Sequence, residues 1–382
     1  MLSLFLFAIH SLKISIPIIS LYGSAPTFFT LWSFLRLFTL PLPEHVYRQC
    51  DDHLYSIYQR FVLFFFQNWL QVKIYVHGDY KQIFEKKENV LYLSNHQSSV
   101  DWIIANMLAI HQGSLGHIRY VLKNELKYIP FYGFYFQQHE CIYVHRNDRG
   151  DLNRVENGMR RVIKNGLPIW LVIFPEGTRF NPISNQNAIQ RSSLFAKEKG
   201  FSPFEYVLYP RSGATVAAIR ALKDHIDAVY DVTLMYNQTY DEQKQIRLAA
   251  PSMFEYLQGQ TNELHIDVRR IAMNEIPYET NEEISHWLYQ RFQLKDQLLK
   301  RFYDFQRKKN FQSEVFSSDE TDHPQELELP FRETLPSCLF LTLTTLPLIL
   351  NEHGRSLYCK ICLFVPPITL LWMHLFSSSR TS

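Results

Sequence analysis

Two short tracts carry the residue types best suited to chemistry. The histidine tract, Asn95–Asp101, follows the apolar run Val90–Leu93 and places His96 five residues before Asp101. The arginine tract, Phe174–Arg179, ends a second apolar run with an acid, a glycine and an arginine. A base with an orienting carboxylate, together with an arginine beside a glycine turn, suits proton abstraction next to an anionic group.

The histidine tract has the layout of a catalytic base. The preceding strand should deliver His96 to a loop, and Ser98 or Ser99 should cap a helix that begins near Val100. Asp101 in the first turn can then accept a hydrogen bond from one imidazole nitrogen and leave the other to receive the proton of a substrate hydroxyl. The alternative is a loop histidine, with Asp101 complementing the helix dipole. The second tract favours the catalytic interpretation.

The arginine tract has the composition of an anion-binding turn. Gly177 permits a tight backbone turn, and Arg179 offers a planar fork matched to phosphate. Glu176 could hold Arg179, or the loop itself, in place through an ion pair. A purely structural turn is the alternative, and it accounts poorly for an arginine and a glutamate clustered at a strand end.

Composition narrows the class of protein. The 382 residues allow one sizeable catalytic domain with extra segments or two ordinary domains, and a net charge of +2 gives no general attraction to nucleic acid. An aromatic content of 15% fits a protein that meets lipid. The five cysteines form no paired framework; Cys359 and Cys362 have C-x-x-C spacing but no second ligand pair, so we expect no metal site and free thiols facing a reducing cytosol.

Uncharged runs near both ends indicate membrane segments. Ile14–Leu35 contains 22 residues without charge, and at a rise of about 1.5 Å per residue it reaches roughly 30 Å, enough to span a bilayer. We expect an uncleaved anchor, because no signal-peptidase-like site follows. Thr334–Asn351 and Ile361–Ser379 are separated by a short charged loop and predict a membrane hairpin.

Five segments follow from these patterns: a membrane anchor at 1–43, an amphipathic membrane-associated helix at 44–72, a catalytic α/β domain at 73–306, a polar linker at 307–333 and a transmembrane hairpin at 334–382. A buried core helix is the alternative for the second segment. The strands expected in the catalytic domain are Lys73–His77, Val90–Leu93, Ile142–Val144, Ile169–Phe174, Ala228–Met235 and Leu264–Val268.

The chain resembles the glycerolipid acyltransferase superfamily, specifically the lysophosphatidic acid (1-acylglycerol-3-phosphate) acyltransferases. Asn95–Trp102 carries their signature N-H-Q-x-x-V-D-W, and the similarity extends over roughly Tyr58–Asp304. The epsilon-type variant, which has a C-terminal apolar hairpin, looks closest. The resemblance implies a glycerolipid acyltransferase-like mixed sheet flanked by helices, with the N-terminal membrane helix and C-terminal hairpin described above.

The resemblance also implies roles for individual residues. His96 and Asp101 would be catalytic, and the residues implied in acceptor binding are Glu176, Gly177, Thr178, Arg179, Arg146 and Lys123. On sequence alone, Lys123 is better explained as a solvated helix lysine. Tyr206–Arg211 resembles a fourth family block on the acyl-donor side, although a plain strand-to-turn interpretation is as good.

The implied reaction moves an acyl group from acyl-CoA, a co-substrate rather than a cofactor, to the sn-2 hydroxyl of lysophosphatidic acid. We expect contact with the lipid bilayer, no nucleic-acid partner, and an endoplasmic reticulum membrane with the catalytic domain facing the cytosol; mitochondrial or nuclear envelope membranes are the alternatives. Protein partners stay unknown. The rival functions are acylation of another lysophospholipid such as lysocardiolipin, a non-catalytic lipid-binding protein, and a thioester hydrolase, for which a phosphate-binding arginine has no evident purpose.

Overall fold

The computed structural model describes residues 2–145, 150–237, 239–241, 243, 246–261, 263–308 and 324–376. Its contacts divide the chain into two compact units. Unit 1 comprises Met1–Leu70, Gly113–Ile169 and Leu329–Ser382, and unit 2 comprises Gln71–Gln112 and Trp170–Glu328.

Unit 2 is built on a mixed sheet with strand order β10-β1-β9-β6-β2-β5. The strands are β1 (Lys73–Gly78), β2 (Val90–Ser94), β5 (Trp170–Ile173), β6 (Ala228–Tyr236), β9 (Glu263–Ala272) and β10 (Gln325–Glu326). Strand β2 runs parallel to both of its neighbours, β5 and β6, whereas β9 is antiparallel to β6. Every residue of β2 is buried, as expected for a central strand whose sequence is a continuous apolar run.

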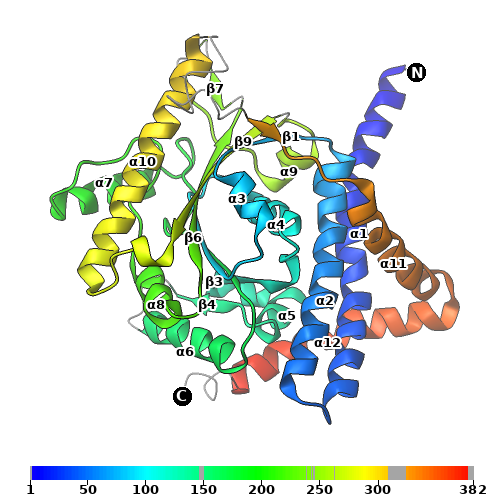
Figure 1. The fold of residues 1–382 in the computed structure, drawn as a ribbon. Helices are drawn as coiled ribbons and strands as arrows, with labels where there is room; N and C mark the ends of the chain where they lie inside the picture. Colours follow the sequence, from blue (N-terminus) through cyan, green and yellow to red (C-terminus); the bar gives the residue numbers. More distant parts are fainter. Residues whose placement is uncertain are drawn as a thin grey trace. The chain divides into compact units, whose positions relative to one another are not determined.

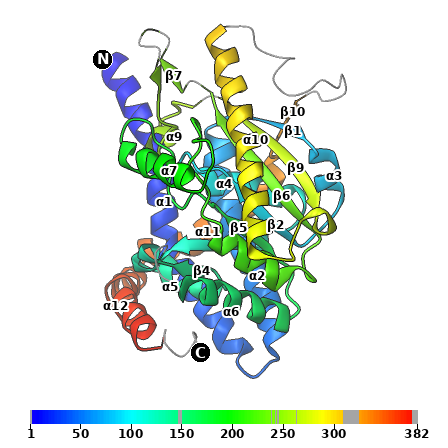
Figure 2. The same cartoon turned by 90° about the vertical axis from the view of Figure 1, so that its left-hand side faces the viewer.

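Helices cover both faces of this sheet. Figure 1 shows α3 (Tyr80–Glu85) and α4 (Asp101–His111) on one side of β6, with α8 (Gly213–Leu222) and α10 (Asn281–Lys308) on the other, and Figure 2 agrees. The remaining elements of unit 2 are α7 (Gln186–Glu198), α9 (Met253–Leu257), the 3-10 turn Met273–Glu275 and the hairpin strands β7 (Tyr240–Asp241) and β8 (Ile246–Arg247). The predicted mixed sheet flanked by helices is therefore confirmed.

Unit 1 combines long helices with a short parallel strand pair, β3 (Ile118–Lys123) and β4 (Ile142–Val144). Its main helices are α1 (Leu2–Thr39), α2 (Glu44–Leu63), α5 (Tyr132–Gln138), α6 (Gly150–Lys164), α11 (Phe331–Leu350) and α12 (Glu352–Phe376). A π-helical stretch, Phe64–Trp69, extends α2, and 3-10 turns lie at Leu115–His117 and Asn124–Tyr128. Helices α1, α2 and α11 pack against one another (Figure 1).

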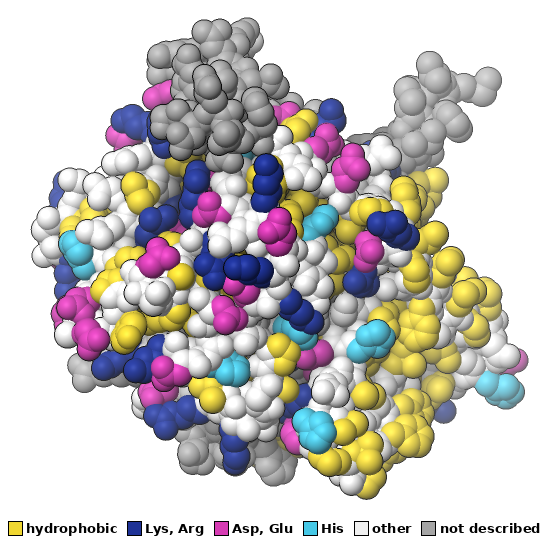
Figure 3. Space-filling view, viewed as in Figure 1, with side chains coloured by type: hydrophobic (Ala, Val, Ile, Leu, Met, Phe, Trp, Pro, Cys, Tyr) yellow, Lys and Arg dark blue, Asp and Glu magenta, His cyan; other side chains and the backbone are white. Residues whose placement is uncertain are grey.

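Among the described residues, three helical segments are long and apolar enough to cross a membrane, judged by length and composition: Ser11–Thr39, Phe331–Leu350 and Glu352–Leu375. Figure 3 shows hydrophobic side chains gathered over α11 and α12, where exposed leucines such as Leu343 and Leu371 lie. Apolar side chains exposed in this number are costly in water but stable in lipid.

The predicted charged loop between the C-terminal apolar runs is wrong, because α12 already begins at Glu352. Asn351 makes the turn, and its side-chain oxygen accepts the backbone N–H of His353 at 2.9 Å. Arg355 donates to the Leu350 carbonyl at 2.8 Å. A charged residue that satisfies the free carbonyls at the end of α11 can thus begin a helix directly after it.

The predicted helix from residue 44 is confirmed as α2, and its buried face carries Tyr47, Tyr55 and Phe61. Contact of α2 with a membrane stays a prediction. The predicted linker 307–333 lies largely outside the described residues, but β10 pairs with β1 and Phe331 already begins α11.

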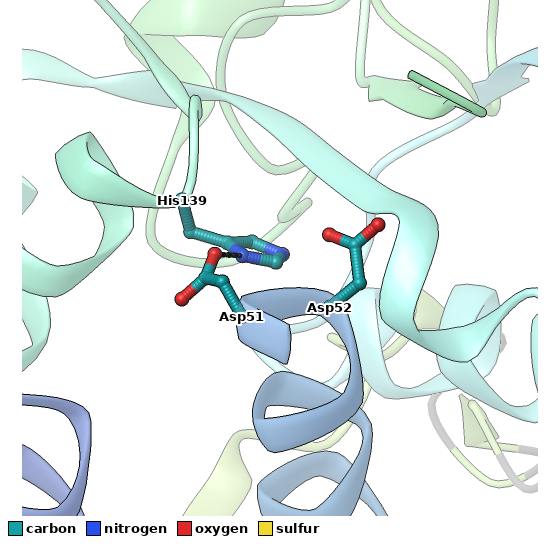
Figure 4. Close-up of side chains that lie close together, drawn as sticks. All are labelled: Asp51, Asp52 and His139. Carbon is teal, nitrogen blue, oxygen red and sulfur yellow. Dashed lines mark hydrogen bonds and ion pairs between the residues drawn. The ribbon is translucent and has the colours of Figure 1, made fainter. Parts of the chain in front are cut away.

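A buried charge network joins α2 to the chain that follows β2 and α4. Arg119 donates to Asp52 Oδ1 at 2.5 Å and to His139 Nε2 at 2.8 Å, and His139 Nδ1 lies 2.6 Å from Asp51 Oδ2. Figure 4 shows the imidazole between the two carboxylates, which occupy consecutive positions of α2. Buried charges of this kind are tolerated only when each has a partner.

This network explains why the structure divides the chain differently from a continuous catalytic domain at 73–306. Gly113–Ile169 belongs to unit 1, together with the helices from both ends of the chain. At Gly116 the backbone approaches α2 so closely that a Cβ atom would lie 2.3 Å from the Asp52 carbonyl oxygen. Such contacts involve residues far apart in the sequence, so periodicity alone does not indicate them.

The network predicts a large loss of stability for Asp52→Ala. The substitution leaves the buried Arg119 without its carboxylate, and we expect the free energy of unfolding to fall by about 3–5 kcal/mol. Urea unfolding of the purified protein in mild detergent measures this. Glu156→Ala, which breaks the exposed pair between Glu156 and Arg160, serves as the control and should cost less than about 1 kcal/mol. If Asp52→Ala and Glu156→Ala lowered the free energy of unfolding equally, the buried pair of Asp52 and Arg119 would not be a main source of stability.

Candidate active site

The histidine tract forms the loop between β2 and α4 in unit 2. His96 Nδ1 lies 2.8 Å from Asp101 Oδ2, so the predicted hydrogen bond between the two residues is present. An ionised carboxylate only accepts hydrogen bonds, which assigns the proton to Nδ1 and leaves Nε2 as the acceptor. The His96 side chain is 21% exposed, so the imidazole is not sealed inside the fold.

Asp101 is fully buried and its oxygens are saturated with donors. Oδ2 accepts the backbone N–H groups of Gln97 at 2.7 Å and Ser98 at 2.9 Å, and Oδ1 accepts the Tyr236 hydroxyl at 2.5 Å. These bonds fix the carboxylate and, through it, the plane of the imidazole. No pattern around Tyr236 singles it out, because it lies on β6, far from the histidine tract along the chain.

The predicted cap of α4 is wrong. Val100 is the N-cap residue, and no side chain caps the helix. The Ser98 hydroxyl instead accepts the Val100 N–H at 3.1 Å and donates to the Pro251 carbonyl, while the Ser99 hydroxyl accepts the Met253 N–H at 2.7 Å. Both serines therefore tie the loop to the segment that begins α9.

The tight turn predicted at Gly177 in the arginine tract is present. Gly177 has a φ of 68°, and its N–H donates to the Phe174 carbonyl at 3.0 Å. A side chain is strained at such a φ, so this position favours glycine. The turn brings Phe180, the first residue after the arginine tract, back to His96. The Phe180 N–H donates to the His96 carbonyl at 2.7 Å.

Glu176 does not pair with Arg179, and that part of the prediction is wrong. Its carboxylate is 2% exposed and accepts the backbone N–H of His96 at 2.7 Å and that of Leu208 at 2.9 Å. Burial raises the pKa of Glu176 to about 8, while the bonds from Leu208 and His96 oppose the shift by stabilising the carboxylate. The alternative that Glu176 holds the loop matches these contacts.

The arginine tract and the next residue, Phe180, thus hold His96 through three contacts. Glu176 binds the His96 N–H, Phe180 binds its carbonyl, and the Phe174 ring stacks on the imidazole with centroids 4.6 Å apart and planes 28° apart. The block Tyr206–Arg211 also lies beside this tract, because the Arg211 N–H donates to the Pro175 carbonyl at 2.8 Å. The two tracts and this block form one hydrogen-bonded assembly.

The other predicted binding residues differ in placement. Arg179 is exposed and Thr178 half-buried, and both lie on the turn that grips His96. Lys123 belongs to unit 1, where it ends β3 and pairs with Glu125 at 3.1 Å, so the helical interpretation of Lys123 is wrong. Arg146 lies outside the described residues.

One group in the described part of the chain has metal-ligand spacing: Asp51, Asp52 and His139 in unit 1. The Arg119 guanidinium lies within hydrogen-bond distance of both Asp52 and His139, as described above. A fixed cation therefore already neutralises these groups, and a metal ion would meet direct repulsion. The cluster is an ion-pair network of the fold.

The sequence matches two family models, Acyltransferase at residues 73–237 and Acyltransferase C-terminus at residues 255–339. It is 40% identical over 367 residues to mouse 1-acyl-sn-glycerol-3-phosphate acyltransferase epsilon, with 95% of this chain and 96% of the mouse protein covered. The chain belongs to the 1-acyl-sn-glycerol-3-phosphate acyltransferase family. The predicted resemblance, including its epsilon type, is confirmed.

A plant relative agrees. The probable 1-acyl-sn-glycerol-3-phosphate acyltransferase 5 of Arabidopsis thaliana is 32% identical, with 77% of this chain and 74% of the plant protein covered. These sequence matches show that the chain is an acyltransferase. The solved structure of the 1-acyl-sn-glycerophosphate acyltransferase PlsC from Thermotoga maritima covers 77% of this chain and 98% of that chain, at 14% identity and a TM-score of 0.44, a weak overall similarity.

The clamp on His96 predicts that Glu176 acts as a positioning residue in this acyltransferase. Glu176→Ala frees two buried N–H groups and loosens the His96 backbone, so we expect kcat for acyl transfer to fall by about 10- to 100-fold, because small misplacements of a catalytic base are costly. Glu198→Ala, an exposed substitution on α7, is the control. An unchanged kcat in the Glu176 variant would exclude the positioning role.

Proposed function

We propose that this protein transfers a fatty acyl group from acyl-CoA to the sn-2 hydroxyl of 1-acyl-sn-glycerol 3-phosphate, giving phosphatidic acid and CoA. The observation that supports it most directly is the bond of His96 Nδ1 to the buried Asp101, which leaves Nε2 as the proton acceptor of a side chain that is 21% exposed. Membership of the family supplies the class of acceptor.

The chemistry follows from the state of the imidazole. As the sn-2 oxygen attacks the thioester carbonyl, His96 Nε2 takes the hydroxyl proton, and Asp101 stabilises the imidazolium that forms. Collapse of the tetrahedral intermediate completes the new ester and breaks the C–S bond, and the imidazolium returns its proton to the departing CoA thiolate. No G-x-S-x-G motif is present in the sequence, which favours direct transfer in a ternary complex without an acyl-enzyme.

In this proposal the phosphate of the acceptor binds on the turn of the arginine tract. Arg179 is exposed on that turn, and Gly177 and Thr178 present backbone beside it. Binding the phosphate there orients the sn-2 hydroxyl, since the same turn holds His96 through Phe180. Arg146 and Lys123 remain proposed as additional positive charge for the phosphate, and Glu176 contributes by holding the loop.

The proposed setting is a membrane. Three span-capable helices and a lipid acceptor both support attachment to a bilayer. We place the protein in the endoplasmic reticulum membrane with unit 2 on the cytosolic side, because acyl-CoA is available there; mitochondrial and nuclear envelope membranes are the alternatives.

His96→Ala should abolish transfer, because a positioned base contributes roughly two to four orders of magnitude in rate. The measurement is transfer of labelled oleoyl from oleoyl-CoA, using membranes that contain equal amounts of each variant. Lysophosphatidic acid, lysocardiolipin, lysophosphatidylcholine and no acceptor are run in parallel. His286→Ala, an exposed substitution on α10, is the control and should keep wild-type activity.

The acceptor panel separates the possible outcomes. Histidine-dependent transfer to lysophosphatidic acid supports the proposal, whereas histidine-dependent transfer only to another lysophospholipid keeps the mechanism and changes the substrate. Hydrolysis of oleoyl-CoA without an acceptor identifies a thioesterase. Full activity of His96→Ala would contradict the proposal that His96 is the base.

Arg179→Ala should act mainly on acceptor binding. Loss of a charged hydrogen bond to phosphate costs about 1.5–3 kcal/mol, so KM for lysophosphatidic acid should rise by about tenfold or more while KM for oleoyl-CoA stays near wild type. Arg191→Ala, on the exposed face of α7, is the matched control. An unchanged dependence on lysophosphatidic acid concentration would remove Arg179 from the phosphate site.

A further inference from the structure

An arginine outside both tracts lies against them in unit 2. Arg247, at the end of the hairpin strand β8, has its guanidinium carbon 4.7 Å from the ring centroid of Phe180, 5.1 Å from that of Tyr206 and 4.3 Å from that of Tyr303. These rings come from three separate segments and form an aromatic cage around the cation. A cation placed over ring faces in this way is attracted by their π electrons.

Hydrogen bonds tie the same guanidinium to the histidine tract. Arg247 Nη2 donates to Gln97 Oε1 at 2.7 Å and to the Tyr303 hydroxyl at 3.2 Å, and Nη1 donates to the Tyr206 carbonyl at 3.3 Å. The Gln97 amide is itself fixed, because its Nε2 donates to the Leu234 carbonyl at 2.9 Å. Gln97 follows His96 directly in the sequence.

Arg247 therefore contacts the immediate neighbour of His96 in one tract and the immediate neighbour of Arg179, Phe180, in the other. Phe180 in turn binds the His96 carbonyl. The positive charge of Arg247 is thus built into the loops that carry the catalytic base and the exposed Arg179.

Among the described residues, Arg247 lacks an ion-pair partner. Several carboxylates lie close enough to influence Tyr206, namely Asp304, Glu205 and Asp296. None of them, and no other carboxylate in the described part of the chain, forms an ion pair with Arg247. In addition, Arg247 Nε is buried without a hydrogen-bond partner. A half-buried cation with only rings and neutral oxygens around it favours an anionic ligand.

We propose that Arg247 is a further phosphate-binding arginine for the acceptor, acting with Arg179 on the phosphate monoester of lysophosphatidic acid. This proposal rests on the proposed function, which supplies the anion. The aromatic cage excludes water from one side of the guanidinium and so strengthens its attraction to the phosphate. Its bond to Gln97 keeps this charge at a fixed position relative to the His96 loop.

The test combines kinetics with binding. Arg247→Met removes the charge at similar length, Arg247→Lys keeps the charge without the fork, and Arg220→Met, an exposed substitution on α8, is the matched control. We expect KM for lysophosphatidic acid to rise by about tenfold or more in Arg247→Met and less in Arg247→Lys. KM for oleoyl-CoA should stay at the wild-type value in all of them.

Thermal unfolding of the purified protein in detergent gives a readout that does not depend on turnover. Lysophosphatidic acid should raise Tm of the wild type and of Arg220→Met, and this shift should be lost in Arg247→Met. Lysophosphatidylcholine at equal concentration serves as the lipid control, because its phosphate is a diester and carries a compensating choline.

Two results would overturn the proposal. One is a wild-type KM for lysophosphatidic acid and a wild-type Tm shift in Arg247→Met. The other is a fall in kcat with both KM values unchanged, which would mean that Arg247 only holds Gln97. If the wild type acylates no lysophosphatidic acid, the proposed function fails, and the Tm shift still decides whether Arg247 binds its phosphate.

Discussion

The site depends on one constraint: a carboxylate buried away from water must have its lone pairs filled by donors. For Asp101 those donors are the His96 ring, two backbone N–H groups of the same loop and the Tyr236 hydroxyl. The hydrogen bonds to Asp101 therefore bend the loop around this carboxylate and attach the loop to β6 through Tyr236. The same bonds place the proton of His96 on Nδ1. The shape of the loop and the chemistry of His96 have the same cause.

A second carboxylate explains why two tracts far apart in the sequence act together. Strands β2 and β5 lie side by side and parallel, so the loops after both strands emerge at the same edge of the sheet. Glu176 at the end of β5 is buried against the His96 backbone, and Phe180 closes the contact from the other side. Direct hydrogen bonds therefore join the proposed phosphate-binding turn to His96, the proposed base. An acceptor bound at that turn would be aligned with His96.

Sequence reasoning succeeded where the interaction was local and failed where it was not. The pair of His96 and Asp101 lies within one loop and its helix, so its spacing together with the second tract predicted it, and the buried strands were visible as continuous apolar runs. Tyr236 and Arg247 contribute through strand pairing and a hairpin, and nothing in their neighbours distinguishes them from other tyrosines and arginines. Strand β3 mixes polar and apolar residues, so its sequence does not indicate a strand. For the same reason the sequence does not indicate that Lys123 ends a strand.

Buried and half-buried arginines have different partners in the two units. This difference distinguishes an arginine that stabilises the fold from one that is available to a ligand. In unit 1, Arg119 is buried with Asp52 and His139, and Asp51 completes the chain of contacts, so the buried guanidinium has its carboxylate partner within the fold. In unit 2, the described part of the chain provides no carboxylate partner for Arg247 and leaves Arg179 exposed at the neighbouring turn. Folding gains little from placing two cations that lack a carboxylate partner among the described residues beside His96, the proposed base. Their placement is explained if a dianionic acceptor completes the charge balance each time it binds, since the attraction then contributes to substrate recognition instead of to the stability of the empty protein.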